Sequence, residues 1–275
     1  MHSDDNSKGA RAHEIEIRAL ESMDDFRACV EMQREIWGAD YDEVVPGSLM
    51  RAAGHVGALA IGAFSASSAL VGFVFGFTGV RGGEVVHWSY MLGVRPAERD
   101  HGVGRRLKEH QRSELARRGI NRMYWTFDPL QARNAHLNIN RLGVRVVEYV
   151  VDMYGASRSA LHHGMATDRL LVEWPTTASD HGGNGELKLG PDTPVFSAFP
   201  RADDVVVDGA PRTAGIEIPW DLQEVVAGSL TVAQEWREST RRHFQWALAN
   251  RYAVTGLHRD AAASRAFFVI DRSEV

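Results

Sequence analysis

The chain has 275 residues, of which 44% are hydrophobic and 24% are charged, and its formal net charge is −5 at pH 7. These values are typical of a folded globular protein of one or two domains, and they do not favour binding to nucleic acid or to an anionic membrane surface. No apolar run approaches the ~20 residues that a membrane-spanning helix needs, so we expect no membrane partner. The polar start, residues 1–13, predicts a flexible tail rather than a signal peptide.

The first part of the chain alternates between strand and helix patterns. Polar and apolar residues alternate over 14–20, which predicts a strand, and Ser22 with Asp25 forms a capping box for the helix that follows. Cys29 lies on the apolar stripe of that helix, so we expect it in the core. As the single cysteine it forms no internal disulfide, which suits a cytoplasmic location. The next predicted elements are a helix over 46–53 and strands over 58–64, 70–78 and 85–94.

A loop with two glycines separates the last of these strands from the next predicted helix, which stops at Gly119. The loop consists of Arg99, Asp100, His101, Gly102, Val103, Gly104 and Arg105. Its glycines leave consecutive backbone N–H groups unobstructed at the positive end of the helix dipole, an arrangement that binds phosphate or pyrophosphate. A dinucleotide-binding loop of the Rossmann type needs a third glycine where Leu107 stands, and a P-loop needs Gly-Lys-Ser/Thr, which is absent.

The remaining elements complete an α/β order. We predict a strand over 122–127, a helix over 131–142 closed by Gly143, and a strand over 144–153, which together give a mixed sheet. A polar, glycine-rich linker is expected over 176–191, after a first domain of residues 14–175. Residues 192–275 form a smaller α+β part, with strands over 194–199 and 215–219, a helix capped by Thr231, and a strand pair over 252–258 and 265–271.

The spacing Arg-x-x-Gly-x-Gly after a strand and Val-x-Pro, in this element order, resembles the GNAT superfamily of acyl-CoA-dependent N-acyltransferases. Further segments are similar to one bacterial and archaeal branch of that superfamily, namely 91–94, 107–112, 125–138, 168–174 and, more loosely, 229–271. The resemblance implies a GNAT fold for residues 14–175, a mixed central sheet flanked by helices. It also implies that the chain moves an acetyl or other short acyl group, such as succinyl, from acyl-CoA to a primary amine by direct attack. The smaller C-terminal part would then shape the acceptor pocket or a homodimer interface.

The resemblance assigns binding roles to particular positions. Leu92, Gly93 and Val94 would pair with the pantetheine arm at the splayed end of a strand and offer a backbone N–H to the thioester carbonyl, and Gly93 is a candidate for a strand bulge. The loop from Arg99 to Arg105 would hold the pyrophosphate, with both arginines adding charged contacts. Asn134 would contact CoA at the head of the next helix, and Asn138 lies one turn further on the same face.

Catalytic side chains are harder to assign. The family commonly places a tyrosine, as general acid, where this chain has Ile139, and many relatives have a glutamate in a strand that here contains no carboxylate. Tyr90 is a candidate acid, because a phenol pKa near ~10 suits protonation of a thiolate. Asp128 could orient a water as base, and Tyr154 is a third candidate. Core packing for the tyrosines and a helix cap or Asp-Pro turn for Asp128 are the structural alternatives.

Two other functions stay open at this stage. A non-catalytic acyl-CoA-binding or regulatory protein would keep the loop without the acid and base, and a mononucleotide-binding α/β protein would use the glycines differently. We expect no metal, because His162 and His163 have no further ligands at metal spacing. Arg241 and Arg242 are expected on a solvated helix face.

Overall fold

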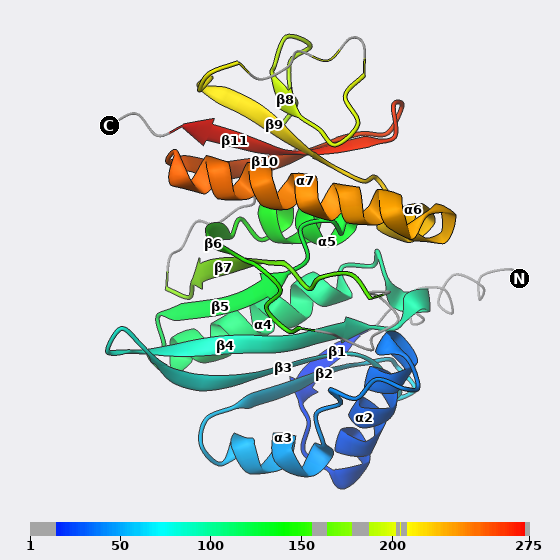
Figure 1. The fold of residues 1–275 in the computed structure, drawn as a ribbon. Coiled ribbons are helices and arrows are strands. Elements are labelled where there is room, and N and C mark those ends of the chain that lie inside the picture. Colours follow the sequence, from blue (N-terminus) through cyan, green and yellow to red (C-terminus); the bar gives the residue numbers. More distant parts are fainter. Residues whose placement is uncertain (1–14, 156–163, 178–186, 202–203, 205–207, 273–275) are drawn as a thin grey trace, which may run out of the picture. The chain divides into compact units, whose positions relative to one another are not determined.

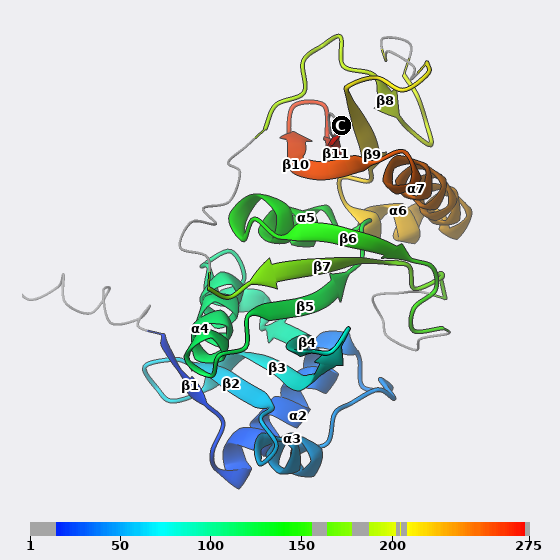
Figure 2. The ribbon, with the colours of Figure 1, turned by 90° about the vertical axis from the view of Figure 1, so that its left-hand side faces the viewer.

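The computed structural model describes residues 15–155, 164–177, 187–201, 204 and 208–272 (Figures 1 and 2). The expected tail, residues 178–186 of the expected linker and the pair His162 and His163 lie outside this part of the chain. The chain divides into two compact units, one of Met1–Trp125 with Pro175–Thr177 and one of Thr126–Trp174 with Ala178–Val275. The domain predicted over 14–175 therefore contributes to both units.

The first unit contains five strands that pair in chain order, with helices on both faces. Its elements are β1 (Glu16–Ala19), α2 (Met23–Trp37), α3 (Gly47–Gly54), β2 (Leu59–Phe64), β3 (Leu70–Arg81), β4 (Glu84–Val94), the 3₁₀ turn η1 (Pro96–Glu98), α4 (Val103–Arg117) and β5 (Arg122–Phe127), whose last two residues belong to the second unit. Strands β1 to β4 pair antiparallel, and β5 pairs parallel with β4. This is the mixed sheet that the element order predicts.

The sheet of this unit has α4 on one face and α2 and α3 on the other (Figure 2). A Cβ on Gly72 would lie 3.2 Å from side-chain atoms of Leu107 and Val103, so this face of the strand packs against α4. Phe73, the next residue, is fully buried in the core of the other layer, which includes Phe26, Cys29, Met32 and Met50 from α2 and α3. The expected place of Cys29 in the core is thus confirmed.

Local signals fix the ends of helix α2. The Ser22 hydroxyl accepts a hydrogen bond from the Asp25 N–H at 3.0 Å, and the Asp25 carboxylate accepts one from the Ser22 N–H at 3.2 Å, which is the predicted capping box. The helix ends at Gly38, whose φ of 112° lies in the region that favours glycine.

The second unit contains a strand pair and a separate sheet. Its elements, after the end of β5, are α5 (Ala132–His136), η2 (Leu137–Arg141), β6 (Arg145–Val150), β7 (Arg169–Pro175, the last residue of which belongs to the first unit), β8 (Val195–Phe196), β9 (Thr213–Ile218), α6 (Leu222–Gly228), α7 (Leu230–Ala249), β10 (Tyr252–Asp260) and β11 (Arg265–Arg272). Strands β6 and β7 pair antiparallel, and the separate sheet has the order β10-β11-β9-β8. Helix α7 packs along β9 and β10 (Figure 1). The predicted fold class, a mixed sheet flanked by helices with a smaller α+β part, is confirmed.

Three predicted details of the second unit and the linker are wrong. Helix α7 is capped by Ser229, whose hydroxyl accepts from the Val232 N–H, and not by Thr231; the short helix α6 before it was not predicted. Thr176 does not begin a linker, because its N–H and hydroxyl bond to the carbonyls of Asn121 and Ile120, and it is buried. The helix predicted over 131–142 is α-helical only to His136, and the following residues form a π-helical turn.

Candidate functional site

Strand β4 carries an extra residue where it leaves its neighbour β5. The parallel pairing with β5 lies at His87 and Trp88, and β3 pairs with β4 on the other side. Opposite Phe75 and Gly76 of β3 the register skips Tyr90, which makes Tyr90 a β-bulge. Bulges of this kind bend a strand and re-aim its side chains and backbone groups.

The residues that follow the bulge return to regular pairing. Leu92, Gly93 and Val94 lie opposite three consecutive residues of β3. Gly93 is therefore not the bulge, and the correction has a packing reason: a Cβ on Gly93 would lie 2.8 Å from side-chain carbons of Ile36 and Phe73. The glycine allows α2 to approach the sheet closely.

The predicted anion loop opens helix α4 with a left-handed backbone. Gly102 is the N-cap, with φ at 74°, and Asp100 has φ at 68°. The N-cap residue has no side chain to bond the first N–H groups of the helix, and the first turn contains no acidic residue. A Cβ on Gly102 would meet nothing within 4 Å, so the space beside the loop is open. Backbone donors at the positive end of a helix, with open space in front of them, fit a phosphate group.

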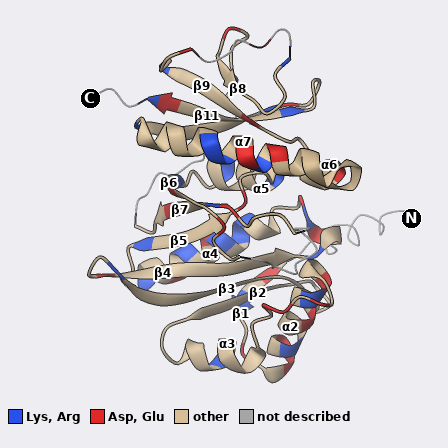
Figure 3. Cartoon of the chain, in the orientation of Figure 1, with Lys and Arg blue, Asp and Glu red and all other residues tan. Residues whose placement is uncertain are grey.

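The two loop arginines make contacts within the chain. Arg99 Nε donates to the carbonyl of Val94 at 3.2 Å and so ties the loop to the end of β4. Arg105 Nε pairs with Glu109 at 2.7 Å across one turn of α4, and both side chains are exposed. Basic side chains continue along this helix (Figure 3). Both arginines are exposed, and their contacts to an anion remain a prediction.

Tyr90 lies on the α2 and α3 side of the sheet. It is partly buried, packs against the core of that layer, and its ring centroid lies 6.0 Å from that of Phe77. The bulge places it directly after Ser89, whose side chain is buried on the α4 side. Tyr90 as a general acid remains a prediction.

Asp128, in the second unit, has a structural contact that its sequence position did not indicate. Its two carboxylate oxygens each accept a hydrogen bond from the Arg237 guanidinium at 2.8 Å, and the residue is only 7% exposed. Arg169 lies 3.9 Å away, and the Leu130 N–H donates to Asp128 in the expected turn. Burial by itself would raise the pKa of Asp128, but the charge and hydrogen bonds of Arg237 hold that pKa below its ordinary range. We therefore withdraw Asp128 as the water-orienting base, because its oxygens are committed to Arg237.

A second carboxylate of this unit pairs with the same helix. Asp168 is fully buried and accepts two hydrogen bonds at 2.8 Å from Arg241 of α7 and one at 2.7 Å from the Tyr149 hydroxyl. The expectation that Arg241 lies on a solvated face is wrong. Sequence reasoning missed both ion pairs, since more than seventy residues separate the partners in each.

The predicted asparagine pair is brought together in the second unit. Asn138 is buried and its Nδ2 donates to the backbone and side-chain oxygens of Asn134, at 2.8 and 3.1 Å. Asn140, which was not predicted, exchanges two hydrogen bonds with the backbone of Leu257 in β10. The hydroxyl of Tyr154 lies 2.9 Å from that of Thr126. The CoA contacts expected of Asn134 and Asn138 remain predictions.

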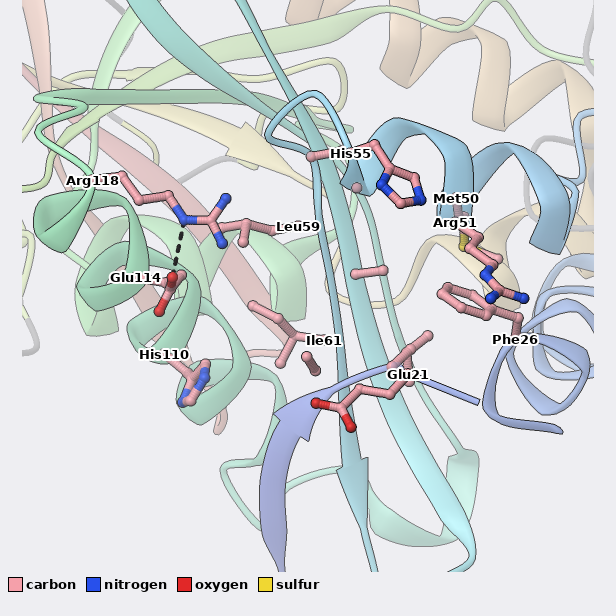
Figure 4. Close-up of a pocket in the computed structure, with 15 residues that line it drawn as sticks. Glu21, Phe26, Met50, Arg51, His55, Leu59, Ile61, His110, Glu114 and Arg118 are labelled. Carbon is pink, nitrogen blue, oxygen red and sulfur yellow. Dashed lines mark hydrogen bonds and ion pairs between the residues drawn. The ribbon is translucent and has the colours of Figure 1, made fainter. Parts of the chain in front are cut away.

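The first unit also has a surface pocket of about 410 Å³ that is separate from the predicted loop (Figure 4). His110, Glu114 and Arg118, from the second half of α4, lie on one side of it, and the side chains of α3 lie on the other. None of the loop residues lines it. Because Gly102 is at the opposite end of α4, this pocket is not the predicted anion site.

The described part of the chain contains no group of His, Cys, Asp and Glu side chains that could hold a metal ion. It also contains no helix with the length and apolar character needed to cross a membrane.

Comparison with known proteins gives structural likeness only. No protein-family model and no curated protein sequence matches the chain. Among solved structures, the chain is similar to the ribosomal-protein-S18-alanine N-acetyltransferase from Escherichia coli, at 18% identity and a TM-score of 0.45, over 61% of this chain and 97% of that one. It is also similar to a chain of the NatC complex bound to Gag peptide and CoA, at 14% identity and a TM-score of 0.47, over 59% of this chain and 98% of that one. The third similar structure is an aminoglycoside 6'-N-acetyltransferase complexed with coenzyme A, at 14% identity and a TM-score of 0.44, over 60% of this chain and 98% of that one. All three TM-scores are below 0.5.

Proposed function

We propose that this chain is a GNAT-type N-acyltransferase, which moves an acetyl or other short acyl group from acyl-CoA to a primary amine. One observation carries the proposal: a strand with a bulge at Tyr90 leads, through a loop with Gly102 in the left-handed region, into the uncapped N-terminus of α4. This arrangement supplies backbone donors at two places, one for the pyrophosphate and one along β4 for the thioester carbonyl.

The proposed reaction is a direct displacement. The free amine attacks the thioester carbonyl carbon, a C–N bond forms, and the oxyanion of the tetrahedral intermediate accepts a hydrogen bond from the backbone N–H of Leu92 or Val94, which alternate with the residues of β4 that bond to β3. The C–S bond then breaks, the amine proton is lost to solvent, and the CoA thiolate takes a proton, for which Tyr90 is the candidate donor. Aminolysis of a thioester depends mainly on positioning, so a strong side-chain base is not required.

Calorimetric titration with acetyl-CoA, succinyl-CoA, free CoA and NAD tests the binding part of the proposal. We expect the CoA species to bind and NAD not to bind. Gly102→Val should weaken CoA binding at least tenfold, or about 1.4 kcal/mol, because a β-branched residue strains the left-handed backbone and blocks the approach to the donors. Gly119→Val is the matched control: it imposes the same strain, at φ 73°, at the other end of α4. Equal affinities of the two variants would contradict the anion loop.

The alternative function, a non-catalytic acyl-CoA-binding or regulatory protein, is favoured by one observation. Asp128, the base that the sequence suggested, is held by Arg237 and does not serve as one. Release of free thiol from acetyl-CoA, measured with amino acids, small amines and peptides as acceptors, separates the two functions. Tight CoA binding without any accelerated thiol release would support the binding protein and contradict the enzyme.

A further inference from the structure

A chain of buried polar side chains in the first unit connects α4 to the bulged strand. Lys108 Nζ donates to the Ser89 hydroxyl at 2.8 Å, and Ser89 donates to Gln111 Oε1 at 2.7 Å. Gln111 Nε2 lies 3.2 Å from His87 Nε2, and His87 Nδ1 lies 3.3 Å from the Thr78 hydroxyl. Ser89, His87, Gln111 and Lys108 are all buried.

These contacts are consistent with a single direction of donation. Because Gln111 Oε1 accepts from Ser89, its Nε2 is the donor to His87 Nε2. The His87 proton is then on Nδ1 and points to Thr78, whose hydroxyl donates at 3.2 Å to the carbonyl of Gly57. Every group in this network has a defined donor or acceptor role, so the network holds α4, β4 and β3 in one arrangement.

Lys108, the first residue of this hydrogen-bond network, is unusual. Lys108 is 3% exposed, and among the described residues its amine contacts Ser89 and the face of the Trp125 ring, at 3.8 Å, with no carboxylate. The nearest titratable neighbour in the network is His87, and burial lowers the pKa of both side chains, that of His87 to about 3. Burying an amine without a counter-charge costs stability, and a hydrocarbon side chain would pack in the same space without that cost. Retention of a lysine here therefore indicates a task other than packing.

The position of Ser89 shows what that task is. Ser89 lies between Trp88, where β4 pairs with β5, and Tyr90, the bulge. The amine of Lys108 thus holds β4 at the point where it separates from β5 and changes register. The backbone N–H groups proposed to receive the thioester carbonyl follow within the next four residues.

We propose that Lys108 is a positioning residue for the acyl transfer proposed above: through Ser89 it fixes the bulge at Tyr90, and so aims the backbone N–H groups of Leu92 and Val94 at the thioester carbonyl. This inference rests on the proposed function for its catalytic consequence. Its structural part, that the Lys108 to Ser89 contact fixes the bulge, stands on the geometry of β4 alone.

Three measurements on the full chain test the inference. The variants are Lys108→Met, which removes the amine and keeps an unbranched apolar side chain, Ser89→Ala, which removes the same contact with a smaller change in volume, and the double variant. Arg117→Met is the control, because it removes an exposed cation from the same helix. Amide hydrogen exchange is measured along β4, CoA affinity by calorimetry, and kcat by thiol release from acetyl-CoA with hydroxylamine as a small nucleophile.

We expect amides from Tyr90 to Leu92 to exchange at least about tenfold faster in Lys108→Met and Ser89→Ala, and not in Arg117→Met. We expect kcat to fall at least about tenfold while CoA affinity stays within about twofold, and the double variant to be no worse than either single one. That split separates positioning from general loss of structure, which would reduce affinity as well.

Contrary results are distinguishable. Unchanged exchange at the bulge in folded variants would overturn the positioning of β4, whatever the activity. Faster exchange with unchanged kcat would overturn the catalytic consequence. A wild-type chain that neither binds acyl-CoA nor releases thiol would overturn the proposed function and this role in catalysis together, and the exchange data would still report on the bulge.

Discussion

The burial of Lys108 gives the stability of the chain a pH dependence that can be measured. In the unfolded chain a lysine with an ordinary pKa of about 10.4 is protonated at neutral pH. In the folded chain burial lowers the pKa of Lys108 well below that value. Folding therefore releases a proton, and this costs free energy that decreases as the pH rises toward the unfolded pKa. The contribution of Lys108 to the free energy of unfolding therefore increases with pH.

The magnitude comes from proton linkage. One proton released on folding changes the unfolding free energy by about 1.4 kcal/mol per pH unit, at pH values between the folded and the unfolded pKa of Lys108. Burial lowers the pKa of His87 to about 3 and that of His243 to about 4. The pH dependence that these two histidines give to the unfolding free energy therefore lies below about pH 7. Burial raises the pKa of Cys29 to about 12, and this side chain reduces stability only above the ordinary thiol range of about 8.5.

Urea unfolding of wild type and Lys108→Met at pH 7.0, 7.5, 8.0 and 8.5 provides the assay. The free energy of unfolding should increase with pH more steeply in wild type than in Lys108→Met, because only wild type releases the proton. Arg117→Met should keep the wild-type slope. Identical slopes for wild type and Lys108→Met would refute the reasoning, and would mean that the Trp125 ring keeps the buried amine charged.

Three further predictions concern other parts of the structure. Asp128→Asn leaves the Arg237 guanidinium buried without its counter-charge, so we expect urea unfolding to show a loss of about 3–5 kcal/mol; a loss below about 1 kcal/mol would contradict a buried pair. Gly76→Ala would make a Cβ collide with Nε2 of the buried His87, and we expect the unfolding free energy to fall by about 1–3 kcal/mol. Gly79→Ala, whose Cβ would meet nothing within 4 Å, should leave the unfolding free energy nearly unchanged. If Tyr90 is the general acid, Tyr90→Phe should lower kcat by about tenfold or more with unchanged CoA affinity; a rate within about twofold of wild type removes Tyr90 from that role.

Features that depend on neighbours in the sequence were predicted well. The capping box of Ser22, the position of Cys29 on an apolar stripe, and the glycines that bound helix α4 at 102 and 119 all follow from residues within one or two helical turns. The mixed order of strands and helices follows from the same local periodicity. The loop that carries the proposed function belongs to this group, since its chemistry lies in its own backbone.

The features that define the surroundings of the site depend on contacts between distant residues. Asp128 and Arg237 are 109 residues apart, and neither position shows by its local pattern that it is buried or which charge it meets. The bulge falls at Tyr90 rather than Gly93 because it depends on the register with β3, which a strand pattern of period two does not specify.

Lys108 illustrates the same distinction within one helix. By sequence it is a basic residue next to Leu107 on a helix rich in charged residues, and nothing local distinguishes it from exposed neighbours such as Arg105. The sequence by itself determined the order of elements and the glycine loop, because backbone conformation and capping are set by adjacent residues. Only the tertiary structure decided which polar groups are buried and what they hold in place, because burial and hydrogen-bond partners arise from packing between elements that the sequence separates.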